Sequence, residues 1–227
     1  MLSKTNIEYG QYIWNPIIGC SGAGCECKNI CWARGMNNRF KWIDNFEKPE
    51  FSYKRLNEIN YLNPKSKVGI RILTCFLSDM FGEEVPLIWR QEIYNFMKAF
   101  SEYKFYTLTK HPENVCKEDI EQYPENSFFG VTINTQKDVE RLDYQFNIGQ
   151  SKDWLSIEPI MGNIILPAPE YLSWIVIGGY SNKQQNNIIN PKWIKNILKQ
   201  VDENKIPVFM KDNLKNVWNG KLRKEII

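Results

Sequence analysis

The sequence predicts an α/β fold of one domain over residues 1–227, a complete or partial (βα) barrel of TIM type built from parallel strands. Short apolar runs alternate with stretches of helical spacing along almost the whole chain. Runs such as "WIVIG" are rich in β-branched and aromatic residues, as in strands buried on both faces. Polar or reactive residues end nearly every predicted strand, which favours a barrel over the alternative, a doubly wound open sheet.

The predicted strands follow one another at regular intervals, and each is bounded by turn-forming or polar residues. In chain order they are 11–18, 68–76, 104–110, 127–134, 153–159, 171–179 and 206–212. Helices are predicted between them at 31–43, 86–100, 112–123, 135–146 and 190–203. Pro86 suits the start of a helix, and Asn134 or Thr135 suits an N-terminal cap. The polar and aromatic stretch at about 44–67 is expected to be a loop or an insertion.

The composition excludes some classes of protein. No run of 18 apolar residues occurs, so no membrane span and no membrane partner are expected. The first residues lack the apolar centre of a signal peptide, and we therefore expect a cytoplasmic protein. With 29 basic and 26 acidic residues, the net charge of +3 neither requires nor excludes a nucleic-acid partner. The sequence shows no basic stripe rich in aromatic residues that would decide the question.

Four of the six cysteines, Cys20, Cys25, Cys27 and Cys31, fall within twelve residues. Disulfides are disfavoured in the cytosol, which leaves a zinc site, an iron–sulfur cluster or uncoordinated thiols. Zinc fingers favour separated ligand pairs, but Cys25 and Cys27 are one residue apart and the single histidine, His111, is distant. A [4Fe–4S] cluster is held by thiolates and tolerates irregular loop spacing, and three thiolates would leave one iron open.

Polar or small residues stand at the ends of the predicted strands. They are Cys20, then Ser78 and Asp79, Thr109 and Lys110, Thr132 and Asn134, Ser156 and Glu158, Gly178 and Gly179, and Lys211 and Asp212. The carboxyl ends of barrel strands carry the chemistry in enzymes of this architecture, so we expect these residues to converge on one mouth.

Several motifs occur in the order found in a known family: "WNPIIGC" followed by "CWA", "FLSDMFGEEVPLIW", "YTLTKHPENV", "FGVTINTQKDVERLD", "LSIEPIMGNI", "WIVIGG" and "IPVFMKD". With these motifs the chain resembles the phage-related Gp37/Gp68-type family of three-Cys-motif proteins, which is similar to radical S-adenosylmethionine (SAM) enzymes. The resemblance covers most of the chain from Ile13 to Asp212. The 44–67 segment and the C-terminal tail match none of these motifs.

The resemblance implies a [4Fe–4S] cluster held by Cys20, Cys27 and Cys31, with Cys25 as the alternative middle ligand. A strict CxxC would place the middle ligand at Lys28, which cannot serve. The implied activity is that of a radical SAM-type iron–sulfur enzyme, which generates a 5′-deoxyadenosyl radical to modify an unknown substrate. Candidate substrates are a nucleic acid, a nucleotide or a peptide. An electron donor of the flavodoxin or ferredoxin type is also implied.

Binding roles follow from the same resemblance, and no side chain is assigned a catalytic role. Ser78 and Asp79 would hold the methionine amino group of SAM. The other cofactor contacts, with ribose, methionine carboxylate or adenine, would come from Thr132, Asn134, Glu158, Gly178 and Gly179. Lys110 and Lys211 are candidates for a substrate carboxylate or phosphate, and His111 is expected to be a loop residue. The alternative is a non-catalytic metal-binding barrel, with zinc or an iron–sulfur cluster, that acts with a three-Cys-motif partner protein.

Overall fold

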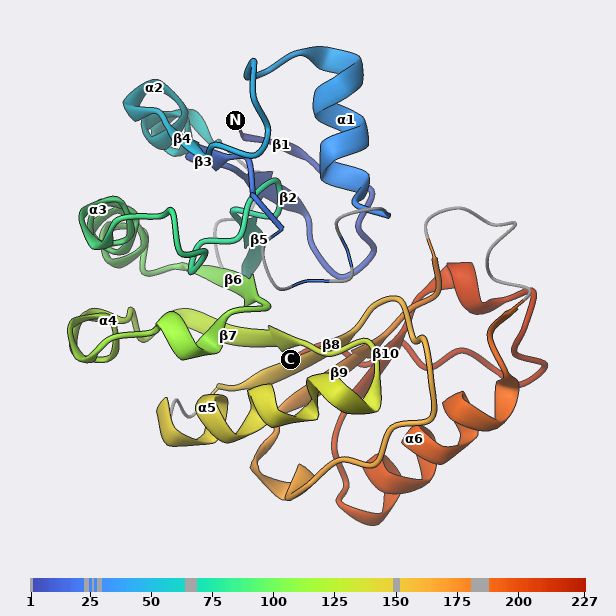
Figure 1. Ribbon diagram of the computed structural model, residues 1–227. Coiled ribbons are helices and arrows are strands. Elements are labelled where there is room, and N and C mark those ends of the chain that lie inside the picture. The colour runs from blue at the N-terminus through green and yellow to red at the C-terminus, as the bar shows by residue number, and fades with distance from the viewer. Residues whose placement is uncertain are drawn as a thin grey trace. The chain divides into compact units, whose positions relative to one another are not determined.

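The computed structural model describes residues 2–22, 25, 27, 30–63, 69–148, 152–180 and 188–227. It confirms the predicted α/β class with a mostly parallel sheet of eight strands (Figure 1). The strand order is β1-β2-β5-β6-β7-β8-β9-β10, and the β1–β2 pair is antiparallel. Within the described ranges, every helix is too short or too polar to span a bilayer.

The chain forms two compact units, residues 1–128 and 129–227. Strand β7 (Ser127–Thr132) begins in the first unit and continues into the second. Both units contain large buried side chains, among them Trp14 in the first and Trp154 in the second.

In the first unit the parallel strands are joined in register, with Trp14 opposite Thr74 and Ile72 opposite Phe105. The Trp14 ring packs against Phe105 at 5.9 Å and Phe96 at 6.4 Å, which ties helix α3 to the sheet. The strands are β1 (Leu2–Lys4), β2 (Tyr12–Trp14), β5 (Ile70–Thr74) and β6 (Tyr103–Thr109), and the longer helices are α1 (Trp32–Phe40), α3 (Leu87–Ala99) and α4 (Lys117–Gln122).

The segment predicted as a loop or an insertion at about 44–67 contains regular structure in its described part. It forms strand β4 (Glu50–Phe51), helix α2 (Tyr53–Asn57) and a 3-10 turn over Glu58–Tyr61, while residues 64–67 lie outside the described residues. The Ser52 hydroxyl caps α2 by accepting the Arg55 N–H at 3.4 Å. The Trp14 indole N–H donates to the Arg55 carbonyl at 3.1 Å, so this helix is fixed by a residue distant in sequence.

The first predicted strand, 11–18, is divided in the structure. Strand β2 ends at Trp14, and Ile17–Ile18 form a separate strand, β3, that pairs antiparallel with β4. Pro16 lies between the two strands, where it cannot donate a ladder hydrogen bond.

In the second unit, strands β7 to β10 are parallel, and Thr132 lies opposite Ser156 in the register. The Trp154 and Trp174 rings lie 5.4 Å apart on one face of this sheet. Helix α6 buries Ile194, Ile197 and Val201, and Asn190 caps its start. The elements are β8 (Trp154–Ile157), β9 (Trp174–Ile177) and β10 (Val208–Met210), with helices α5 (Arg141–Ile148) and α6 (Pro191–Glu203).

Candidate functional site

The backbone before Cys20 is fixed against the segment that follows β5. Gly19 has φ +107°, its N–H donates to the Leu77 carbonyl at 3.0 Å, and its carbonyl accepts from the Ser78 hydroxyl at 2.6 Å. The Cys20 N–H donates to the Phe46 carbonyl at 2.7 Å. A Cβ at Gly19 would lie 3.0 Å from that same carbonyl oxygen. Glycine is therefore required here for both conformation and space.

The Cys20 thiol lies close enough to Cys27 and Cys31 to respond to their charges. The pKa of Cys20 is raised to about 12, chiefly by burial and in smaller part by the nearby charges of Asp79, Cys27 and Cys31. The Gly22 N–H lies 3.4 Å from the Cys20 sulfur and donates a hydrogen bond to it, which acts to lower the pKa of Cys20. Three thiolates so placed repel one another, and a bound metal cluster would offset that repulsion.

These thiols do not already form a closed metal site. In the parts of the chain that the structure describes, no three His, Cys, Asp or Glu side chains are grouped as metal ligands. All six cysteines are free thiols. The donor set suits an iron–sulfur cluster, because soft thiolates bind iron and zinc in preference to hard cations.

Cys31 is the N-cap of helix α1. Its sulfur accepts a hydrogen bond from the Arg34 N–H at 3.4 Å. A backbone N–H at the start of α1 is therefore directed at the Cys31 sulfur, an arrangement that would also orient a metal-bound sulfur.

Cys25 is directed toward a different partner. Its sulfur lies 3.4 Å from Nε2 of His111, and Nδ1 of His111 lies 3.0 Å from the Glu113 carboxylate. His111 does lie in a loop, after β6, and its side chain is largely buried there.

Asp79 connects the segment after β5 to the end of β6. One carboxylate oxygen accepts from the Phe81 N–H at 3.0 Å and from the Thr109 hydroxyl at 2.7 Å, and the other accepts from the Lys110 N–H at 2.9 Å. The side chain is 8% exposed. Asp79 therefore fixes the backbone beside Cys20, whatever further role it has toward a ligand.

In the second unit, Asn134 is held at the start of the loop after β7. Its N–H donates to the Asp138 carboxylate at 2.9 Å, and its side-chain amide donates to the Pro159 carbonyl at 2.8 Å. Thr132 and Ser156 lie next to each other on one face of the sheet and are each 1% exposed. Among the described residues, neither hydroxyl has a hydrogen-bond partner.

Glu158 and Lys211 form an ion pair at 3.0 Å beside Gly178. A Cβ at Gly178 would lie 3.0 Å from carbons of both side chains, so the absence of a side chain makes room for the pair. The other Glu158 oxygen is buried, and no partner for it occurs within the described ranges. An unpaired carboxylate oxygen that is shielded from water is suited to accept a hydrogen bond from a ligand.

Asn213 was missed by sequence reasoning. Its side-chain oxygen accepts from the Gly179 N–H at 2.9 Å, and its amide donates to the Gly179 carbonyl at 2.9 Å. This pair of bonds fixes the backbone of the predicted glycine pair. An asparagine after a strand gives no signal of such a distant partner.

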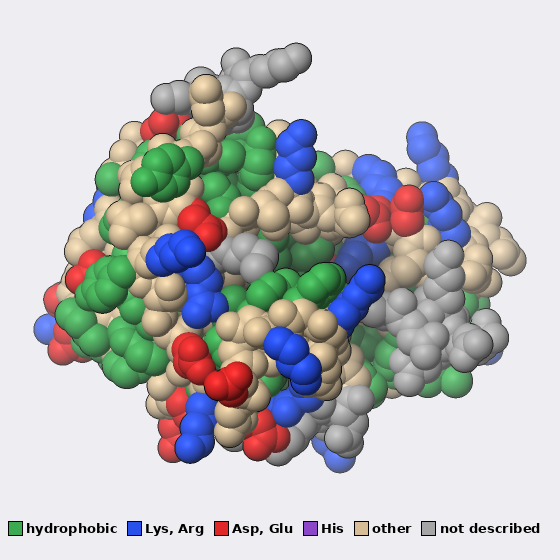
Figure 2. All heavy atoms as spheres, turned by 90° about the horizontal axis from the view of Figure 1, so that it is seen from above, with side chains coloured by type: hydrophobic (Ala, Val, Ile, Leu, Met, Phe, Trp, Pro, Cys, Tyr) green, Lys and Arg blue, Asp and Glu red, His purple; other side chains and the backbone are tan. Residues whose placement is uncertain are grey.

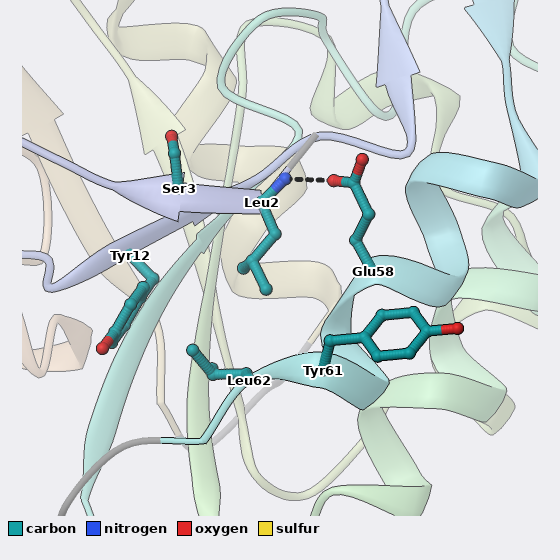
Figure 3. Close-up of a pocket in the computed structure, with 6 residues that line it drawn as sticks. All are labelled: Leu2, Ser3, Tyr12, Glu58, Tyr61 and Leu62. Carbon is teal, nitrogen blue, oxygen red and sulfur yellow. Dashed lines mark hydrogen bonds between the residues drawn. The ribbon is translucent and has the colours of Figure 1, made fainter.

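One pocket of the first unit lies away from these residues. It has a volume of about 310 Å³ and is lined by Leu2, Ser3, Tyr12, Glu58, Tyr61 and Leu62 (Figure 3). Figure 3 shows the Leu2 N–H directed at the Glu58 carboxylate, to which it donates a hydrogen bond. None of the residues predicted to bind a cofactor or metal lines this pocket.

The fold of this chain is similar to that of spore photoproduct lyase in solved structures. Spore photoproduct lyase complexed with dinucleoside spore photoproduct is 10% identical, with a TM-score of 0.53 over 89% of this chain and 64% of that one. A tyrosine-to-phenylalanine mutant of spore photoproduct lyase is 10% identical, with a TM-score of 0.60 over 92% of this chain and 78% of that one. The chain thus spans less than two thirds of the length of the lyase in the complex.

The chain belongs to the family described as "Protein of unknown function (DUF5131)", whose model matches residues 4–223. No curated protein matches the chain. The similarity to the lyase structures establishes the fold, and the chemistry has to be argued from the site.

Proposed function

We propose that this protein is a radical SAM-type iron–sulfur enzyme of the Gp37/Gp68-type kind, in which Cys20, Cys27 and Cys31 hold a [4Fe–4S] cluster. The observation that carries the proposal is that Cys20 and Cys31 both pack against one hydrophobic cluster, formed by Ile18, Ala33, Ile43, Phe46 and Leu77. The charge of Cys27 acts on the same Cys20 thiol and raises its pKa. These observations support the proposal because they occur in a chain whose fold is similar to that of spore photoproduct lyase. When bound and reduced, a cluster held here would supply the one electron that splits SAM into methionine and the 5′-deoxyadenosyl radical, which would abstract hydrogen from a substrate.

The cysteine loop contributes orientation and charge. Backbone N–H groups of Gly22 and Arg34 donate to the sulfurs of Cys20 and Cys31, each at 3.4 Å. Hydrogen bonds to ligating sulfurs stabilise the reduced, more negative state of a cluster. The hydrogen bonds of Ser78 and Asp79 fix the backbone that adjoins Cys20.

The second unit offers the groups that would hold the organic part of SAM or the substrate. Thr132, Ser156 and Glu158 have buried polar atoms without a partner in the described chain. Hydroxyl or amino groups of a ligand would satisfy them. Lys211, paired with Glu158, and Lys110 remain candidates for a substrate anion.

The proposal is tested by the iron content of four variants after anaerobic reconstitution. We expect Cys20→Ala, Cys27→Ala and Cys31→Ala each to lose the iron and the broad charge-transfer absorption of the wild type. Cys25→Ala is the matched control, because its thiol faces His111 and it should retain iron. Loss of iron in Cys25→Ala with retention in Cys27→Ala would assign the middle ligand to Cys25 instead.

The alternative is a non-catalytic protein that uses the same thiols for zinc. A colourless protein with one zinc ion and no iron would favour it. A flavodoxin- or ferredoxin-type electron donor, a three-Cys-motif partner protein, a cytoplasmic location and a single functional domain all remain parts of the proposal.

A further inference from the structure

Helix α1 and the residue after it carry exposed aromatic and basic side chains. We call this surface the α1 patch and define it by Trp32, Arg39, Phe40 and Lys41, all of which are exposed. Trp32 is 41% exposed and Phe40 48% exposed. Met36 and Trp42 are half-buried beside the patch, and Trp42 also packs against the hydrophobic cluster that includes Ala33. Trp32, Met36 and Phe40 are four residues apart and therefore share one face of the helix, and the adjoining face buries Ala33 and Asn37.

The planar groups of the patch are already layered. The Phe40 and Trp42 rings lie 5.3 Å apart with an angle of 15° between their planes. The Arg39 guanidinium carbon lies 5.1 Å from the centre of the Phe40 ring. Aromatic rings and guanidinium planes held in this way are surfaces on which nucleobases stack.

The charge of the patch is unbalanced. Residues 32–41 include Arg34, Arg39 and Lys41 and no acidic residue. Arg34 is paired with Glu47 at 3.2 Å, but within the described residues neither Arg39 nor Lys41 has an acidic partner. On the face drawn in Figure 2, positive and negative side chains are interspersed, so that face carries no extended positive charge.

From these observations we infer that the α1 patch binds single-stranded nucleic acid. Bases would stack on Trp32 and on the Arg39–Phe40 layer, and Arg39 and Lys41 would contact phosphates. A single strand is favoured over a duplex, because the faces of paired bases are covered by their neighbours. The patch takes up α1, which stands apart from α2 and α3 in the first unit (Figure 1).

The α1 patch adjoins the proposed cluster site. Trp32 directly follows Cys31, which caps α1 and is a proposed cluster ligand. A nucleic-acid strand bound to α1 would lie beside the proposed cluster. We therefore infer that the substrate of the proposed enzyme is a single-stranded nucleic acid. That last step rests on the proposed function, whereas the binding itself does not.

The test is fluorescence anisotropy of a labelled oligothymidylate of about 16 nucleotides, titrated with the full chain at several salt concentrations. We expect Trp32→Ala to weaken binding about tenfold, in line with the loss of one stacked base. Arg39→Glu should weaken binding and reduce the salt dependence. Tyr144→Ala is the matched control, since Tyr144 is 49% exposed on helix α5 and should leave binding unchanged.

The inference is overturned if the wild type does not bind the oligonucleotide at low salt, or if Trp32→Ala and Tyr144→Ala bind equally well. Should Trp32→Ala fail to fold, Arg39→Glu alone decides, because Arg39 is exposed and its charge does not support the core. Cys20→Ala separates the two proposals. Binding by this iron-free variant supports the patch even if no radical chemistry is found, and loss of binding only in the absence of iron would contradict it.

Discussion

Asp153 should make the stability of this protein fall as the pH rises. The residue directly precedes β8, is 3% exposed, and has one carboxylate oxygen without a partner among the described residues. Burial raises its pKa from 3.8 to about 8. The free energy of unfolding should therefore depend strongly on the pH, because the ionised Asp153 carboxylate is destabilising in the folded state.

The sign follows from proton binding. Below about pH 4 the carboxyl group is protonated in both the folded and the unfolded state. Between about pH 4 and pH 8 only the unfolded chain loses the proton, so the free energy of unfolding decreases as the pH rises. Above about pH 8 both states are ionised and the penalty is constant. At about 1.4 kcal/mol per pKa unit, the upper limit is about 6 kcal/mol.

Asp153→Asn removes the titration while keeping the shape of the side chain. Urea denaturation at pH 5 and pH 8 should show the wild type losing a few kcal/mol more than the variant between these conditions. Asp143→Asn, at an exposed position on α5, is the control and should follow the wild type. Equal pH dependence in Asp153→Asn and the wild type would refute the reasoning.

Two further predictions concern packing. A Cβ at Gly130 would lie 2.3 Å from the Trp154 ring, so Gly130→Ala should lower the free energy of unfolding by at least about 3 kcal/mol or prevent folding. A Cβ at Gly35 in helix α1 would meet no atom within 4 Å, so Gly35→Ala should raise the free energy of unfolding by about 0.5–1 kcal/mol. Urea denaturation of both variants checks this, and equal stability would contradict it. Arg90 and Asp119 form a buried ion pair at 2.8 Å, and Arg90→Met should cost about 3–5 kcal/mol by leaving the carboxylate unpaired. If thermal unfolding shows that Arg90→Met lowers the free energy of unfolding by less than about 1 kcal/mol, the prediction is wrong, and water reaches the Asp119 carboxylate.

The parallel sheet was predictable because each of its longer strands has a local sequence signal. Apolar runs such as 171–179 are bounded by turn residues and alternate with helical stretches, and the structure confirms the α/β class. Strand β1 was missed, since Leu2–Lys4 is short and mostly polar and depends on its pairing with β2. Helix α2 was missed for a similar reason, because the Trp14 indole fixes it from a distance.

The candidate site was predictable in its residue types and less so in its contacts. Crowded cysteines are visible in the sequence, but the direction of Cys25 toward His111 depends on how the loop meets the end of β6. Two of the hydrogen bonds to Asp79, from Thr109 and Lys110, likewise join segments about thirty residues apart. The assigned roles of Thr132, Asn134 and Glu158 in cofactor binding stay predictions.

The central claim is that the thiols of the loop after β3 hold a redox-active cluster that cleaves SAM. The most direct measurement is the release of 5′-deoxyadenosine when anaerobically reconstituted protein is reduced in the presence of SAM. The proposed function predicts this product from the wild type and from Cys25→Ala, and none from Cys27→Ala. Iron-loaded, reduced wild-type protein that leaves SAM intact would contradict it.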